Sequence, residues 1–113
     1  MTSEYLHIER LIEGFRISCQ TENKSSKTIE WYTCFLKRFR RFLQSNNYPT
    51  KVTEINRSHV RSFILYLQQE AKTPRTGKPL SASTVQGYAR TLKVFLAFRK
   101  SFPIDRILMY HLR

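Results

Sequence analysis

Apolar side chains recur at steps of three and four residues in four separate stretches of the chain, the spacing that predicts amphipathic helices. The first stretch predicts a helix from a cap at Ser3 to about Gln20, and the second predicts a helix that begins at Ser25 or Ser26. A third, shorter helix is predicted after a cap at Asn56. The apolar positions of these helices are Tyr5, Ile8, Ile12, Phe15 and Cys19; Ile29, Tyr32, Leu36, Phe39 and Leu43; and Val60, Phe63, Ile64 and Leu67.

A fourth helix is predicted to open at Ser81 and to end near the sequence KSFP, with an apolar stripe of Val85, Tyr88, Leu92 and Phe95. The final stretch, IDRILMYHLR, predicts the start of a fifth element. Period-two alternation, which would predict a half-buried strand, is absent from the sequence. The pattern therefore predicts an all-α bundle of four to five helices joined by short connections.

Composition adds a size and a class to this pattern. A chain of 113 residues suits one domain, and a fold of this size buries roughly two thirds of the surface that the unfolded chain exposes. Apolar residues make up 41% of the chain and aromatic residues 13%, enough to offset the entropy of ordering the chain. We therefore expect a folded domain and not a disordered tail.

The charge balance indicates the kind of partner. Lys and Arg outnumber Asp and Glu by 20 to 8, which gives a formal charge of +12 and favours polyanions. Nucleic acid is favoured over an anionic membrane, because each amphipathic segment is needed for the core. The charged start, MTSEYLHIER, lacks the apolar region of a signal peptide, and no stretch approaches 18 apolar residues. We expect a soluble cytoplasmic domain, associated with the nucleoid when bound to DNA.

Cysteine and histidine positions predict neither a metal site nor a cofactor. Cys19 and Cys34 lack the spacing of metal ligands and are expected to be reduced thiols. The three histidines, His7, His59 and His111, share no ligand spacing either, and His59 is expected in the first turn of the third helix.

One helical sequence pattern occurs twice, as TIEWYTCFLKRF from Thr28 and as TVQGYARTLKVF from Thr84. The same shift of 56 positions (84 minus 28) places Ser25 on Ser81. Any two amphipathic helices share apolar spacing, so the matched Leu and Phe residues alone prove little. The matched Ser-x-x-Thr starts favour a shared role, because each serine-capped first turn offers free N–H groups to a phosphate.

Helix geometry, with 100° per residue, separates the outer faces of the two matched helices. The second helix turns outward a cationic set: Lys27, Trp31, Cys34, Arg38 and Arg41. Its run from Lys37 to Arg41, with Phe39 turned to the core, is suited to phosphates, which fix register without reading sequence. The fourth helix turns outward Ser83, Gln86, Gly87, Arg90, Val94 and Ala97, with Lys93 on the flank. Its low profile suits the major groove, where Arg bonds guanine and Gln bonds adenine, so Gln86 and Arg90 are predicted to contact base edges.

The connection before the fourth helix, KTPRTGKPLS, contains the basic residues Lys72, Arg75 and Lys78 and no acid. We expect it to be a mobile, positive loop. The complete set of predicted DNA-binding residues is Ser25, Lys27, Thr28, Lys37, Arg38, Arg41, Arg75, Lys78, Ser83, Thr84, Gln86, Arg90 and Lys93.

Three stretches in order, SSKTIEWYTCFLKRFRRFL, VTEINRSHVRSFILYLQQ and LSASTVQGYARTLKVFLAF, resemble the N-terminal core-binding domain of tyrosine recombinases, the phage and transposon integrase family. The resemblance runs from about Ser3 to Phe102. It implies a SAM-like orthogonal bundle of two crossed helical hairpins on one face of double-stranded DNA, with the helices that begin at Ser25 and Ser81 in the major groove. It also implies a core-binding domain over residues 1–102 and a linker over 103–113 toward a separate catalytic domain.

The resemblance implies that the arginine, lysine and histidine set and the tyrosine nucleophile lie beyond Arg113. Tyr110 lacks a His-x-x-Arg motif in the right order, so no catalytic residue is predicted in this chain. The family's Asn-Pro after the fourth helix is replaced by SFPIDRI, which puts the path of the linker in question.

We expect the DNA-binding arm of a site-specific recombinase, monomeric alone and oligomeric on DNA through the full-length protein. One alternative is a standalone helix-turn-helix regulator, which predicts a turn of three or four residues before the recognition helix. The other is a basic bundle that docks an acidic protein.

Overall fold

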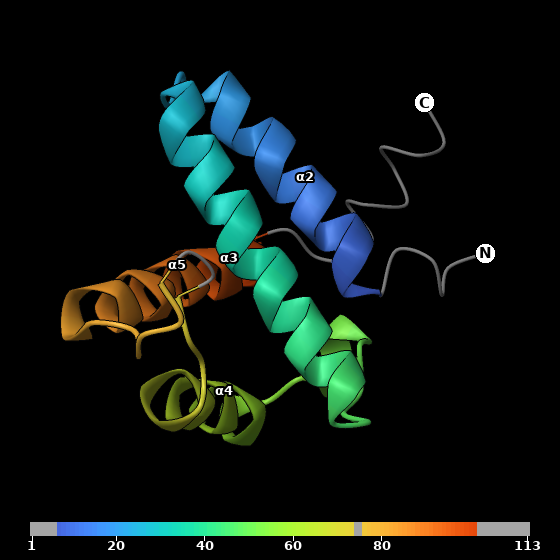
Figure 1. Cartoon of the computed structure of the whole chain (residues 1–113). Helices are drawn as coiled ribbons and strands as arrows, with labels where there is room; N and C mark the ends of the chain where they lie inside the picture. The colour runs from blue at the N-terminus through green and yellow to red at the C-terminus, as the bar shows by residue number, and fades with distance from the viewer. Residues whose placement is uncertain (1–6, 74–75, 102–113) are drawn as a thin grey trace.

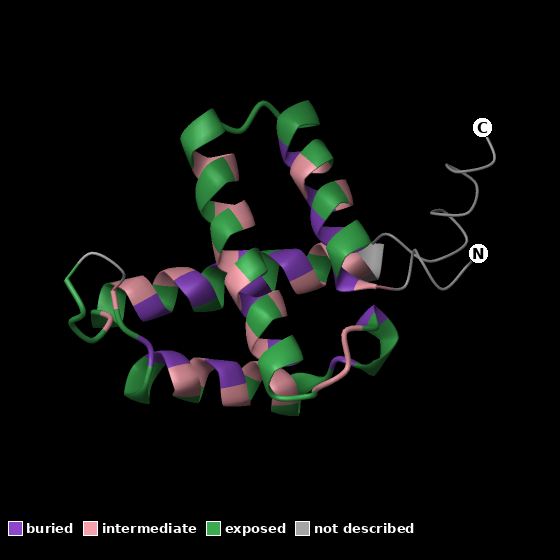
Figure 2. Ribbon diagram, turned by 45° about the vertical axis from the view of Figure 1, so that its right-hand side comes forward, coloured by how far each residue is buried: buried purple, intermediate pink, exposed green. Residues whose placement is uncertain are grey.

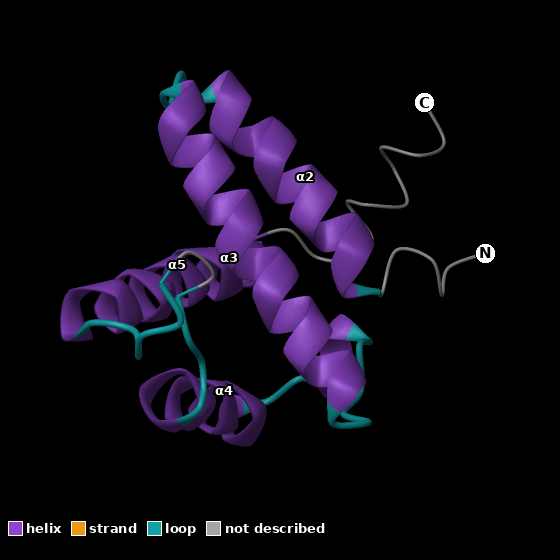
Figure 3. Cartoon of the chain, in the orientation of Figure 1, coloured by secondary structure: helices purple, strands orange, loops and turns teal. Residues whose placement is uncertain are grey.

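The computed structural model describes residues 7–73 and 76–101, and these residues form four α-helices. They are α2 (Ile8–Thr21), α3 (Ser26–Ser45), α4 (Arg57–Gln69) and α5 (Ala82–Ser101), with a 3₁₀ turn, η1 (Val52–Glu54), before α4. Figure 3 shows helices joined by loops, and β-structure among the described residues is limited to isolated bridges. The predicted all-α class is confirmed.

The helices form two crossed pairs, as the views in Figures 1 and 2 both show. Helix α2 runs antiparallel beside α3, and α4 runs antiparallel beside α5, with the second pair lying across the first. Helices α3 and α5 are both central, because each contacts the other three helices. The predicted bundle of two crossed hairpins is confirmed.

The starts of α3 and α5 have the same local geometry. The Oγ of Ser25 accepts a hydrogen bond from the Thr28 N–H at 3.1 Å, and the Oγ of Ser81 accepts one from the Thr84 N–H at 3.2 Å. In both pairs the serine and threonine hydroxyls lie 2.9 Å apart. Because a side-chain cap satisfies a free N–H of the first turn, each serine defines where its helix begins. The repeated sequence pattern therefore corresponds to two helix N-termini with the same capping geometry.

The third predicted cap is also present. Asn56 accepts from the N–H groups of Ser58 and His59, while the His59 Nδ1 accepts from the Asn56 N–H at 3.1 Å. This reciprocal arrangement closes the first turn of α4. His59 therefore lies in the first turn of α4, as predicted.

The predicted start of the first helix is wrong. His7 has an extended backbone (φ −80°, ψ 144°) and forms a β-bridge with Lys51, so the helix begins at Ile8. The Ile8 N–H donates to the Thr50 carbonyl at 2.9 Å, a tertiary contact that replaces a helical bond. The predicted cap Ser3 and the apolar Tyr5 lie outside the described residues, as does the expected fifth element after residue 102.

The core is built from the apolar stripes of all four helices, which turn inward in Figure 2. Phe39 of α3 and Phe63 of α4 are fully buried, with ring centroids 5.0 Å apart. A second contact between the two hairpins joins Phe15 of α2 to Phe95 of α5, edge-on, with ring centroids 5.6 Å apart. Of the predicted apolar positions in these helices, the following are buried: Ile8, Ile12, Phe15, Cys19, Leu36, Phe39, Leu43, Phe63, Leu67, Val85, Tyr88, Leu92 and Phe95.

A local bridge precedes α5, and a long-range contact lies near its end. Before its start, Lys72 and Pro79 form a β-bridge, and the Thr73 N–H donates to the Lys78 carbonyl at 2.7 Å. Near its end, Arg99 donates to the carbonyls of Val52 and Ile55 at 3.0 and 3.2 Å, which joins α5 to the η1 region. The connection from Glu70 to Ser81 is longer than the turn of three or four residues that the helix-turn-helix alternative predicts.

Candidate nucleic-acid interface

A groove of about 510 Å³ lies between the N-terminal halves of α3 and α5, and we call it the α3–α5 groove. Thr28 reaches it from α3, and Ser83, Thr84 and Arg90 reach it from α5, so four predicted site residues come together. None of its lining residues is acidic. The full lining is Thr28, Trp31, Tyr32, Phe35, Ser83, Thr84, Gly87, Arg90 and Thr91.

Close packing of aromatic rings brings the two helices together at the floor of this groove. Phe35 of α3 stacks on Tyr88 of α5 with centroids 4.0 Å apart and planes 21° apart. A Cβ added at Gly87 would lie 3.5 Å from the Phe35 ring, so the glycine admits a close approach. Gly87 is half-buried against α3, and its predicted outward position is wrong.

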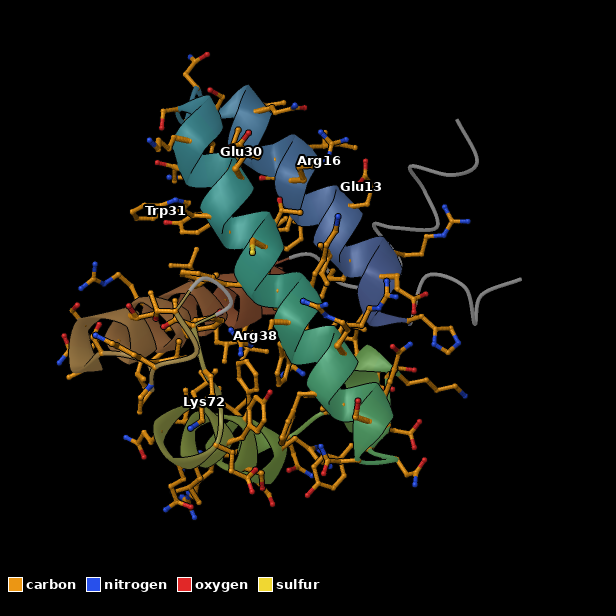
Figure 4. The ribbon with its side chains drawn as sticks, in the orientation of Figure 1. Glu13, Arg16, Glu30, Trp31, Arg38 and Lys72 are labelled. Atoms are coloured by element: carbon orange, nitrogen blue, oxygen red, sulfur yellow. The ribbon has the colours of Figure 1, made fainter. Side chains whose placement is uncertain are left out.

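Arg38 is also not the free outward cation that was predicted. Its guanidinium donates to the Tyr88 hydroxyl at 3.1 Å and to the Lys72 carbonyl at 3.4 Å, and it lies 5.9 Å from the centre of the Tyr88 ring. Burial lowers the pKa of Arg38, but hydrogen bonds to the Tyr88 and Tyr66 hydroxyls outweigh it and raise that pKa above its ordinary value. The charge therefore joins α3 to α5 and to the connection before α5, as Figure 4 shows for Arg38 and Lys72.

Apart from Gly87, the outer face of α5 is as predicted. Gln86, Arg90, Lys93 and Ala97 are exposed, and Val94 is exposed to 37%. Among residues 7–73 and 76–101, the side chains of Gln86, Arg90 and Lys93 form no hydrogen bond or ion pair. Gln86, Arg90 and Lys93 are therefore available to a ligand on one face of α5.

A second groove, of about 850 Å³, lies between α2 and α3, and we call it the α2–α3 groove. It contains the predicted residues Lys37 and Arg41, together with Arg16 and Arg40, which sequence reasoning missed. The full lining is Arg16, Gln20, Ser26, Ile29, Glu30, Thr33, Cys34, Lys37, Arg40 and Arg41. It is the more cationic of the two grooves.

Acidic residues of α2 engage the two arginines that were missed. Arg16 pairs with Glu13, and the Arg40 Nε lies 3.8 Å from a Glu9 carboxylate oxygen. The hydrogen bond from Arg16 lowers the pKa of Glu13 below its ordinary value. The spacing of Glu13 and Arg16 along one helix could have revealed the first pair, whereas the second joins two helices and has no local signal.

The remaining predicted residues lie at the edges. Ser25 and Lys27 are exposed at the start of α3, Lys78 is exposed in the connection before α5, and Arg75 lies outside the described residues.

The described residues hold no group of three possible metal ligands, and no helix among them is long and apolar enough to cross a membrane. Cys34 is exposed, while Cys19 is buried, and that burial raises the pKa of its thiol.

A comparison with protein families gives a match that extends from α2 to α5. The family model for the phage integrase N-terminal SAM-like domain matches residues 11–95, which is well over half of the chain. No curated protein and no solved structure matches the chain.

Proposed function

The chain belongs to the phage integrase family, whose N-terminal SAM-like domain it contains, and from that premise we propose that it binds double-stranded DNA with sequence preference. Membership ties the chain to site-specific recombination. The proposed contact surface is formed by α3 and α5. In this role the domain supplies affinity and part of the choice of site.

The observation that carries the proposal is the meeting of two equivalent helix starts at one groove without acidic residues. Thr28 and Thr84, each hydrogen-bonded to a capping serine, both line the α3–α5 groove. Free N–H groups of a first turn and threonine hydroxyls are good phosphate ligands. The formal charge of +12 adds long-range attraction for the polyanion.

The exposed side chains divide into two roles. Lys27, Lys37 and Arg41 are exposed on α3 and are proposed to hold phosphates. Gln86 and Arg90 are exposed on α5 and are proposed to bond base edges in the major groove. Lys93 and the basic residues of the preceding connection, Arg75 and Lys78, extend the cationic surface.

The wider assignments are proposals as well. Residues 1–102 form a core-binding domain and residues 103–113 begin the linker to a catalytic domain. The domain is monomeric alone, assembles on DNA through the full-length protein, and acts in the cytoplasm at the nucleoid. Strand cleavage belongs to residues outside this chain.

Fluorescence anisotropy with labelled duplexes tests the proposal. A duplex selected by the protein from a random pool is compared with an unselected duplex over a range of salt. Binding should weaken with a log–log slope of about −0.9 for each phosphate neutralised. Arg41→Ala should weaken binding to both duplexes alike, whereas Arg90→Ala should cost about 1 to 3 kcal/mol on the selected duplex alone.

Arg61→Ala is the matched control, because it removes an exposed cation of α4 and changes the net charge equally. Equal losses for Arg41→Ala and Arg90→Ala on both duplexes would contradict the division of roles. Absence of duplex affinity at low salt would overturn the proposed function and favour an acidic protein partner.

A further inference from the structure

Trp31 is the only tryptophan in the sequence, and its side chain is 60% exposed. It projects from α3 on the side where α5 lies, away from α2, as Figure 4 shows. Within the described part of the chain, the indole Nε1–H has no hydrogen-bond partner. A large amphipathic ring is thus held at the α3–α5 groove with no described group covering most of it.

The surroundings of Trp31 differ from those of an ordinary exposed apolar residue. Ile17 and Leu65 are exposed to 48% and 47%, but neither lines the α3–α5 groove. Trp31 shares that groove with Thr28, Ser83 and Arg90, which offer hydroxyl and guanidinium donors. An apolar surface beside donors, with no acid among the lining residues, matches the edges of base pairs, which present acceptors and methyl groups.

Duplex geometry decides which part of DNA the indole meets. Bases in a duplex are stacked, so a side chain that enters the major groove meets their edges and not their faces. The apolar group on those edges is the C5-methyl group of thymine. An indole held in the same groove as Arg90, on the α3 side, is therefore suited to pack on such a methyl group.

We propose that Trp31 is a specificity-determining residue that packs against the methyl group of one thymine in the bound duplex. The inference rests on the proposed DNA binding and adds a base preference that no hydrogen bond supplies. Arg90 and Gln86 discriminate through donors and acceptors, while Trp31 discriminates through contact area. A thymine is then preferred over cytosine at one position, because cytosine lacks the methyl group.

Replacement of single thymines by deoxyuridine tests this directly, since only the methyl group is lost. In the selected duplex, one replacement should weaken wild-type binding about fourfold, the value expected for one buried methyl-sized group. Trp31→Ala should bind the thymine duplex several-fold more weakly than wild type and should respond to the same replacement by less than about 1.5-fold. Ile17→Ala, the matched exposed apolar control, should keep the wild-type affinity and the fourfold response.

Intrinsic fluorescence gives a second readout, because Trp31 is the sole tryptophan. Its emission should shift to shorter wavelength or be quenched as the selected duplex is added. The inference is overturned if the emission stays unchanged at saturation, if no thymine replacement affects wild type, or if Trp31→Ala keeps the full response. Those results with intact anisotropy binding leave the proposed function standing, whereas absence of binding by anisotropy removes both.

Discussion

Helix α3 has a groove on each side, and the two grooves differ in what their cations do. The α2–α3 groove has four basic residues, of which Arg16 and Arg40 are engaged by Glu13 and Glu9. The α3–α5 groove has Arg90 as its one charged lining residue, and no described acid engages it. The number of basic residues in a groove therefore does not show how many of them are free to bind a ligand.

The same distinction applies along α3 itself. Arg38 and Arg40 are joined to neighbouring elements by hydrogen bonds or an ion pair, while Lys37 and Arg41 are exposed. Four basic residues of one run thus have two different roles. A partner on another helix, and not the residue type, decides whether an arginine stabilises the fold or is available for a ligand.

Phe39→Ala should disrupt both grooves, because Phe39 is a core residue of α3 and both grooves lie against this helix. The ring is fully buried and contacts Phe63 of α4, so truncation leaves a cavity. We expect a loss of about 3 to 5 kcal/mol in the free energy of unfolding, measured by urea denaturation with circular dichroism. Val94→Ala, at an exposed site of α5, should change it by less than about 0.5 kcal/mol. A loss below about 1 kcal/mol for Phe39→Ala would contradict the central place of α3.

Arg38→Ala and Arg41→Ala should separate a structural cation from an available one. Arg38→Ala removes hydrogen bonds to Tyr88 and Lys72 and should lower the free energy of unfolding by about 1 kcal/mol, after allowance for solvent screening. Arg41→Ala should leave it unchanged within about 0.5 kcal/mol. Thermal and urea unfolding give the measurement, and equal stabilities for the two variants would remove the distinction between these two arginines.

The two cysteines offer a chemical test of which groove DNA covers. Cys34 lines the α2–α3 groove and is exposed, whereas Cys19 is buried with a raised pKa, so a chromogenic aromatic disulfide should modify Cys34 far faster. If Lys37 and Arg41, which line the same groove as Cys34, hold phosphates, saturating duplex should slow the reaction of Cys34 several-fold. Cys34→Ser is the control for the assignment of the fast phase. An unchanged rate of Cys34 modification at saturating duplex would contradict phosphate binding by Lys37 and Arg41 and restrict the contact to the α5 side of α3.

The smallest effect is expected at Glu13, whose pairing with Arg16 limits the availability of that arginine. Because the folded-state pKa of Glu13 is lowered, the pair stabilises the fold above the ordinary glutamate pKa, and the effect is lost as pH falls through the folded value. Wild type should lose slightly more stability than Glu13→Gln between pH 7 and pH 3. The difference in melting temperature should be at most about 2 °C, since the pair is exposed. Identical pH profiles would show that the pair contributes nothing.

The parts of the fold that local chemistry controls were predictable. Ser25, Asn56 and Ser81 cap helices because their side chains bond N–H groups two or three residues ahead, and that relation is visible in a sequence. The apolar stripes likewise predicted the core faces. The error at the first helix arose where a bridge from His7 to Lys51 overrode local helix preference.

The parts that depend on how helices cross were not predictable. A helical projection places Arg38 and Gly87 outward, but the contacts of Arg38 with Tyr88 and of Gly87 with Phe35 follow from the approach of α5 to α3. The pairing of Arg40 with Glu9 has the same origin. The projection did predict the exposure of Gln86 and Arg90, because that face of α5 meets no other helix.

Gly87 has a consequence for how this domain could change over generations. Helical glycine is less favourable than alanine by about 1 kcal/mol, yet here it keeps the Phe35 ring against the α5 backbone. Alanine would fit at ordinary contact distance from the Phe35 ring, while a longer side chain would crowd that ring. Residue 87 is therefore a position at which side-chain size can change the shape of the α3–α5 groove. A substitution there could alter the proposed DNA-binding surface while every proposed contact residue is retained.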